Sequence, residues 1–196
     1  MSEPGKFEKA ITLFDAYNAN DPHYETSGNE RYPKELLYSK RMTEKLNAYL
    51  PSAAEHLRLA VHCQHIGRWE ITRDSFPMDK KGYLQWRTTL ALHHAAVAEH
   101  ILLQCGYDKT LIEEVKFLLQ KKQLHQHADT QALEDVICLV FIEFYLNDFA
   151  LQHEDDKVVD ILKKTLKKMS SRAIGEAVKI PVTEHVKELI QKAATP

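Results

Sequence analysis

The sequence has few of the residues that interrupt regular structure, with six glycines and seven prolines among 196 residues. Gly and Pro are the strongest local breakers of helices and strands, so their scarcity favours long elements. The sequence also lacks any sustained alternation of β-branched residues, the period-two pattern of half-buried strands. The segments between the breakers are rich in Leu, Ala, Glu, Lys and Gln, which are good helix formers. The sequence therefore predicts an all-α fold without a sheet.

Cysteine is scarce as well. The three cysteines, Cys63, Cys105 and Cys138, form no Cys-x-x-Cys pair, and their odd number gives no disulfide framework. Each lies within an apolar or helical run. We therefore expect buried free thiols in a reducing compartment.

Long apolar runs are absent too. Residues 1–6 contain no apolar segment of the kind that directs secretion, and the longest apolar stretch, residues 136–146, is interrupted by Glu143. That stretch is also too short to span a bilayer. These features predict a cytoplasmic protein with no membrane partner.

Neither sign of charge dominates, because 26 Lys and Arg face 28 Asp and Glu, for a formal net charge of −2. A broad nucleic-acid-binding surface needs an excess of positive charge, so we expect no nucleic-acid partner. The 44% apolar and 28% charged content is that of an ordinary globular protein. Residues 1–196 are therefore expected to form a single compact helical domain, and no feature of the sequence indicates an oligomeric state.

Nine helices are predicted, at residues 5–19, 33–49, 52–68, 80–105, 108–123, 129–152, 155–169, 170–179 and 183–194. Asp108 and Thr183 are expected at helix N-caps, and Gly106 at a helix end. The Lys-rich segment 163–168 fits the solvated face of an amphipathic helix. Residues 20–32 are expected to form a surface loop, and residues 69–79 an irregular loop of the kind that carries binding sites.

Histidine, by contrast, is abundant, with 11 residues. His94 lies on the apolar face of its predicted helix and is expected to point inward. Asp135 precedes an almost wholly apolar helical segment, where a charge must be paired or bound to metal. His62 and His65, three residues apart, can share one helix face. Imidazole and carboxylate suit Zn, Mn, Fe or Ni, so these four residues are candidate ligands of a divalent metal ion.

Three of these four candidate ligands also have a structural interpretation. His94 can bond a backbone carbonyl in the core, Asp135 can cap a helix or pair with an Arg, and His62 can lie at the surface. Metal binding, anion binding and a structural role all remain open for the set.

The order of these histidine and aspartate motifs along the chain resembles that in the HD superfamily of helical phosphohydrolases. Residues 60–67 are similar to the family's Ala-x-x-x-His-Asp-Ile-Gly motif, residues 94–102 to its His-x-x-x-(Gly/Ala)-x-x-Ile-Leu helix, and Asp135 to its later metal-binding Asp. The His-Asp doublet falls on Gln64 and His65, and the family's earlier His falls near Tyr38 or Ser39. The resemblance implies an HD-domain-like bundle, with its core at about 33–150 and added terminal helices.

It also implies a metal-dependent hydrolase of a small phosphate-containing, nucleotide-like substrate. A bound ion would activate water, with Glu134 or Glu70 as general base. The predicted substrate-binding residues are Arg68, Arg73, Arg87 and Trp69, because arginine reads phosphate bidentately and tryptophan stacks on rings. Alternatively, these arginines pair with nearby carboxylates and do not bind a substrate. Two further alternatives for the protein are a non-catalytic helical module that binds an anionic ligand, and a helical scaffold with structural histidines.

A closer resemblance, over nearly the whole chain, is to an uncharacterised family of bacterial and fungal proteins with a domain of unknown function. It rests on residues 33–42, 64–71, 83–87 and 133–135. Some members carry glutamyl-tRNA synthetase-like labels, and residues 65–68 and 168–171 do mimic the HIGH and KMSKS signatures. We reject that activity, because the HIGH element follows a strand in an α/β nucleotide-binding fold and no strand is predicted before His65. The family implies helical structure and no established activity.

Overall fold

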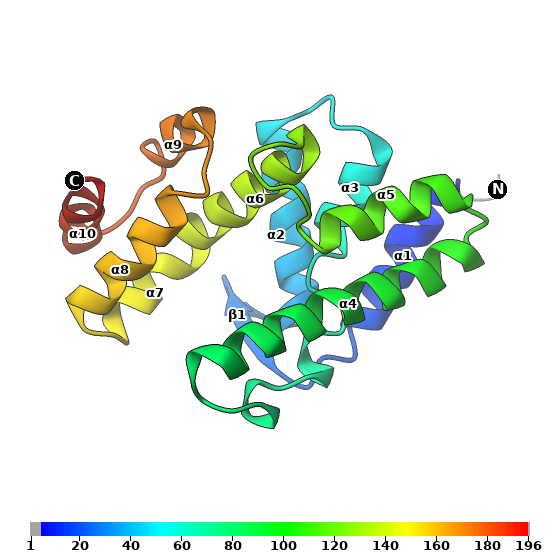
Figure 1. Cartoon of the computed structure of the whole chain (residues 1–196), viewed down its shortest axis with the longest axis horizontal. Helices are drawn as coiled ribbons and strands as arrows, with labels where there is room; N and C mark the ends of the chain where they lie inside the picture. Colours follow the sequence, from blue (N-terminus) through cyan, green and yellow to red (C-terminus); the bar gives the residue numbers. More distant parts are fainter. Residues whose placement is uncertain (1–4, 196) are drawn as a thin grey trace. The chain divides into compact units, whose positions relative to one another are not determined.

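The computed structural model describes residues 5–195 and is built almost entirely of helices (Figure 1). The elements in chain order are α1 (Lys6–Asn18), β1 (Tyr24–Ser27), β2 (Glu30–Pro33), α2 (Lys34–Tyr49), α3 (Glu55–His62), η1 (Arg68–Glu70), η2 (Arg73–Ser75), α4 (Lys80–Gln104), α5 (Lys109–Leu119), α6 (Ala128–Val140), η3 (Phe141–Tyr145), α7 (Leu146–Leu151), α8 (Asp155–Leu166), α9 (Ser171–Ala177) and α10 (Glu184–Ala194). The predicted all-α class is confirmed. The prediction that residues 1–6 contain no secretion signal concerns residues 1–4 as well, and these four lie outside the described residues.

Helix ends follow the local chemistry of the sequence. The carboxylate of Asp108 accepts from the Leu111 N–H at 3.1 Å, and the hydroxyl of Thr183 accepts from the Val186 N–H at 3.4 Å, so both predicted N-caps are confirmed. After α4, Gly106 takes a φ of +78° and its N–H bonds the carbonyl of Leu103. This is the left-handed C-terminal cap that glycine provides without strain.

The expectation that residues 20–32 form a loop, and that there is no sheet, is wrong. β1 and β2 pair as an antiparallel hairpin with Tyr24 opposite Pro33 and Ser27 opposite Glu30. Gly28, with a φ of +62°, allows a two-residue turn between the strands. Four-residue strands are too short to show an alternating pattern, so the hairpin depends on the turn and on packing against α2.

Two predicted helices are shorter or less regular than expected. The helix expected at 52–68 is α3, which begins after Pro51 and ends at His62, and residues 63–67 form turns. The helix expected at 129–152 is interrupted by the π-helical turn η3. Such a turn preserves the helical direction, and the apolar periodicity therefore does not reveal it.

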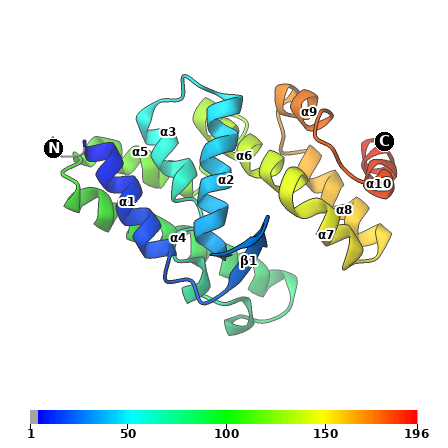
Figure 2. The same ribbon diagram turned by 180° about the vertical axis from the view of Figure 1, so that it is seen from behind.

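The chain divides into two compact units, Met1–Lys122 and Gln123–Pro196. In the first unit α3 packs against α1, α2 and α5, and Leu57, Leu59 and Val61 on α3 are fully buried (Figure 2). The turn at residues 63–67, which follows α3, is therefore largely buried within the first unit. The HD-like core predicted at about 33–150 extends over the boundary between the units.

The second unit consists of α6 to α10. α8 packs against α10 and α7, and α6 packs against α9. Its most deeply buried large side chains are Leu133, Leu139 and Leu146. No helix within residues 5–195 is long and apolar enough to cross a membrane, and the three cysteines are buried free thiols as expected.

Candidate functional site

The turn after α3 is fixed by a glycine and an asparagine. Gly67 has a φ of +66°, and its N–H donates to Asn18 Oδ1 at 3.3 Å. A Cβ at this position would lie 2.8 Å from His93 Nε2 and 3.1 Å from Tyr17 Cε1. Gly67 thus lets the chain turn where neighbouring side chains leave no room for a Cβ. It thereby sets the positions of His65 before it and Arg68 after it.

We expect Gly67→Ala to lower the free energy of unfolding by about 1–3 kcal/mol, because it combines a strained φ with a steric clash. Gly28→Ala is the matched control. Its φ is similarly positive, but a Cβ there would meet nothing within 4 Å. Chemical unfolding should show a larger loss for Gly67→Ala than for Gly28→Ala, and equal losses would contradict the crowding argument.

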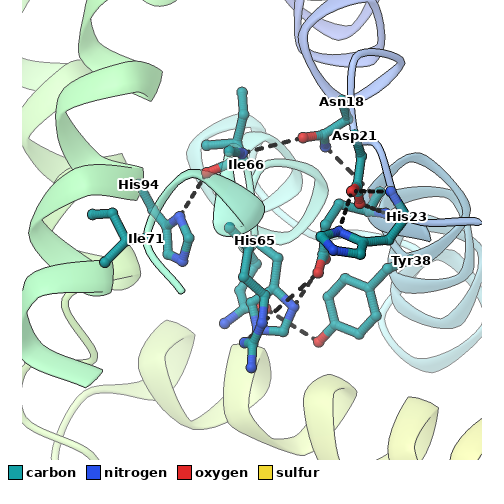
Figure 3. Close-up of polar contacts among 12 residues, drawn as sticks. Asn18, Asp21, His23, Tyr38, His65, Ile66, Ile71 and His94 are labelled. Atoms are coloured by element: carbon teal, nitrogen blue, oxygen red, sulfur yellow. Dashed lines mark hydrogen bonds and ion pairs between the residues drawn. The ribbon is translucent and has the colours of Figure 1, made fainter. Parts of the chain in front are cut away.

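His65 is held by three neighbours. Its ring stacks on Tyr38 with centroids 4.3 Å apart (Figure 3). Its Nε2 lies 2.9 Å from Arg68 Nη1, and its Nδ1 lies 3.3 Å from Glu35 Oε2. Because the guanidinium can only donate, Nε2 accepts and Nδ1 carries the proton. Burial lowers the pKa of His65 well below 6.5, and the nearby cations add to that effect. His65 is therefore a neutral imidazole at neutral pH.

Glu35 lies in the first turn of α2 and is only 6% exposed. Burial raises its pKa from 4.5 to about 7, although Arg68, whose Nε lies 3.7 Å from Glu35 Oε1, opposes the shift. Its backbone N–H donates to the carboxylate of Asp21 at 3.0 Å. The carboxyl group of Glu35 therefore gains or loses its negative charge near neutral pH, and it does so in contact with His65 and Arg68.

His94 points toward the same turn from α4. Its Nδ1 lies 2.6 Å from the Ile66 carbonyl and must donate to it, which leaves Nε2 as an acceptor (Figure 3). Burial lowers the pKa of His94 from 6.5 to about 3. The predicted inward position of His94 is confirmed, and so is the backbone carbonyl partner that was the structural alternative.

A cavity of about 340 Å³ lies beside His65 and His94. Its polar lining residues are Gln64, His65, Arg68, Arg87, Thr88, His94, Gln120, Lys121 and Lys122, and its apolar ones are Leu84, Leu90, Ala91, Leu92 and Leu119. Four of these side chains are cationic, and none of the described lining residues is an Asp or a Glu. The cavity is therefore suited to an anion.

The arginines differ in how firmly they are held. Arg68 lies over the ring of Trp86, 5.2 Å from its centroid, in addition to its contacts with His65 and Glu35. Arg87 is exposed and donates to the hydroxyl of Tyr83 at 3.3 Å. Arg68 thus provides a fixed charge, whereas Arg87 can adjust to a ligand.

Several other predicted site residues lie elsewhere in the first unit. Arg73 donates to the carbonyls of residues 76, 77 and 79 and holds the loop before α4. Trp69 packs near Tyr17 with ring centroids 6.0 Å apart. Glu70 accepts from the Tyr17 hydroxyl at 2.7 Å and lies 3.1 Å from His93 Nε2. None of these predicted residues is among the side chains that line the cavity.

His62 is likewise away from the cavity. It ends α3 and is 4% exposed, so it does not lie at the surface. Its Nε2 lies 2.9 Å from Asp15 Oδ1 and its Nδ1 2.8 Å from Thr43 Oγ1. Both ring nitrogens therefore already have protein partners.

Asp135 and Glu134 belong to the second unit. Asp135 is 2% exposed, and its carboxylate accepts from the Ser170 N–H at 2.8 Å, the Ser170 hydroxyl at 2.6 Å and Gln131 Nε2 at 2.9 Å. Ser170 in turn caps α9. Glu134 lies 3.4 Å from Lys168 Nζ. Asp135 thus anchors the start of α9, which was the structural alternative for this residue.

The four predicted metal ligands belong to different units, with His62, His65 and His94 in the first and Asp135 in the second. Within residues 5–195 there is no group of three or more His, Cys, Asp or Glu side chains that could hold a metal ion. The ring nitrogens of His62 and His65 bond protein groups, and so do both carboxylate oxygens of Asp135. The donor atoms of His62, His65 and Asp135 are thus engaged by protein groups, and metal binding by the four residues stays a prediction.

The sequence interpretation missed Glu35, Gln64 and Thr88 as parts of this site. Glu35 opens a helix beside charged neighbours, which is an ordinary surface pattern, and only packing buries it. Lys121 and Lys122 form a visible basic pair, but such pairs mark solvated helix faces far more often than sites. Their positions at the cavity depend on the turns after α5.

The fold and site thus define a helical protein with a cation-lined cavity in its first unit. The chain belongs to the family described as Domain of unknown function (DUF4202), which matches residues 8–190. No curated protein and no solved structure matches it.

Proposed function

We propose that this protein binds a small phosphate-bearing molecule in the cavity beside His65 and His94, and that it does so without a metal ion. The observation that supports the proposal is the convergence of four cationic side chains on a cavity that has no carboxylate among its described lining residues. The volume, about 340 Å³, lies within the range of small-molecule sites.

Each part of the lining has a chemical use. Arginine presents a planar fork that matches two phosphate oxygens, and lysine adds a compact charge. Nε2 of His94, neutral at neutral pH, can accept a hydrogen bond from a ligand hydroxyl. The leucines on α4 and α5 can contact an apolar part of the ligand. A mononucleotide or a phosphorylated sugar has this combination of features.

Isothermal titration of the full chain with inorganic phosphate, adenosine monophosphate and sugar phosphates tests the proposal. At least one phosphate compound is expected to bind, and Arg87→Ala is expected to weaken it about tenfold or more, since tenfold is about 1.4 kcal/mol of lost interaction. Arg87 is exposed, so its removal should leave the unfolding transition unchanged. Lys81→Ala, an exposed cation on α4 that does not line the cavity, is the matched control.

Two outcomes would overturn the proposal. One is no binding by any phosphate compound at low salt, where charge interactions are least screened. The other is stoichiometric Zn, Mn, Fe or Ni in the purified protein, together with metal-dependent phosphate release that His94→Ala abolishes. That result would support the hydrolase predicted from the HD resemblance. A cytoplasmic location also stays a prediction.

A further inference from the structure

The second unit contains an apolar groove of about 810 Å³ that is separate from the cation-lined cavity. Its apolar lining consists of Ile142, Leu162, Leu166, Ile174, Ala177, Val178, Ile180, Val182, Ile190, Ala193 and Ala194. These come from η3, α8, α9, α10 and the segment that joins the last two helices. Figure 1 draws α9 in orange and α10 in red. On each helix the lining residues recur every three or four positions, so each presents one face.

Part of this lining is unusually exposed for apolar side chains. Val178 is 81% exposed and Ile174 is 37% exposed, one turn apart at the end of α9. Scattered exposed apolar residues are normal, but here they belong to one continuous groove. Covering them with an apolar ligand would remove their surface from water, which is favourable.

The charged part of the groove has one sign. Lys163 on α8 and Lys167 at the C-cap of the same helix line it together with Lys187 on α10. Lys187 pairs with Glu184 at 2.9 Å, whereas Lys163 and Lys167 are exposed and have no acidic partner within the part of the chain described. No Asp or Glu is among the described lining residues. The groove therefore combines a long apolar wall with two unpaired cations.

We propose that this groove binds a single-chain amphiphile with an anionic head, namely a long-chain fatty acid. The alkyl chain lies against the apolar faces of α8, α9 and α10, and the carboxylate is held by Lys163 and Lys167. The methylene stems of these lysines extend the apolar wall while their ammonium groups stay in water. The volume is that of small-molecule sites, which are mostly apolar with a few placed polar groups.

The test is a fluorescence titration of the full chain with cis-parinaric acid, followed by displacement with palmitate. Saturable binding of about one molecule per chain is expected. Methyl palmitate, which lacks the charge, should displace the probe at least tenfold less well. The double variant Lys163→Glu with Lys167→Glu should weaken binding at least tenfold, whereas Lys192→Glu, on α10 but outside the groove, should not.

Val178→Asp tests the apolar wall independently. Because Val178 is already 81% exposed, this variant should fold normally and still bind the probe at least tenfold more weakly. Absence of saturable binding, or binding that neither variant weakens, would overturn the proposal. So would a dimer in light scattering that Val178→Asp dissociates, which would mean that a second copy covers the groove. Binding to anionic vesicles without binding of monomeric fatty acid would overturn it as well.

Discussion

Replacing Asp135 by alanine is expected to lower the free energy of unfolding by about 3–5 kcal/mol, because it removes a buried charge acceptor from three donors. Those donors are the N–H and hydroxyl of Ser170 and the amide of Gln131, and Asp135 is 2% exposed. These donors are partly buried, and without Asp135 they would lose this acceptor. Chemical unfolding followed by circular dichroism measures the loss.

Two variants calibrate this result. Asp135→Asn keeps one carbonyl oxygen and should cost less than alanine. Asp160→Ala, an exposed carboxylate on α8, should change stability by no more than about 0.5 kcal/mol. If instead Asp135→Ala unfolds like the wild type, or differs from it only when divalent metal is added, the anchoring role is wrong and the predicted metal-ligand role gains support.

Glu35→Gln is expected to change how stability depends on pH. Burial raises the pKa of Glu35 from 4.5 to about 7, so between these values the folded chain keeps a proton that the unfolded chain has lost. Its contribution is fully present below pH 4.5 and is lost as pH rises through about 7. A shift of this size corresponds to about 3 kcal/mol, so the wild type should lose about that much relative to Glu35→Gln between pH 5 and 8.

The comparison with the variant is needed because other groups act in the opposite direction. The lowered pKa values of His65 and His94 stabilise the fold above about pH 6.5, and this contribution is lost as pH falls. The charges of Arg68 and Lys34 also bear on Glu35. Glu44→Gln, an exposed carboxylate on the same helix, is the control. Parallel pH profiles for wild type and Glu35→Gln would contradict the buried-carboxyl argument.

The helices could be predicted because their signals are local. Apolar spacing on α4, the cap at Asp108 and the stop at Gly106 each act within a few residues, and all three agree with the structure. The β1–β2 hairpin was missed because its short strands are supported by packing rather than by pattern. The end of α3 at His62 was missed because no glycine or proline interrupts the sequence before Gly67.

The candidate site could be predicted only in part. His65, Arg68, Arg87 and His94 do line one cavity, and their residue types already indicated an anion or a metal. Asp135 matched the expected metal ligand by type and order alone. A carboxylate at the start of a buried helical segment can hold an ion or cap a neighbouring helix, and the sequence does not contain the distance to Ser170.

By itself, the sequence determined the helical class, most helix ends, the buried thiols and the inward direction of His94, because these follow from spacing and composition within one element. Only the tertiary structure decided which charges meet. In the folded chain, Glu35 is buried in contact with Arg68, Lys121 lines the cavity, and Asp135 accepts a hydrogen bond from Ser170. The physical reason is that periodicity specifies which face of a helix is buried, whereas the partner of that face depends on how all the helices pack.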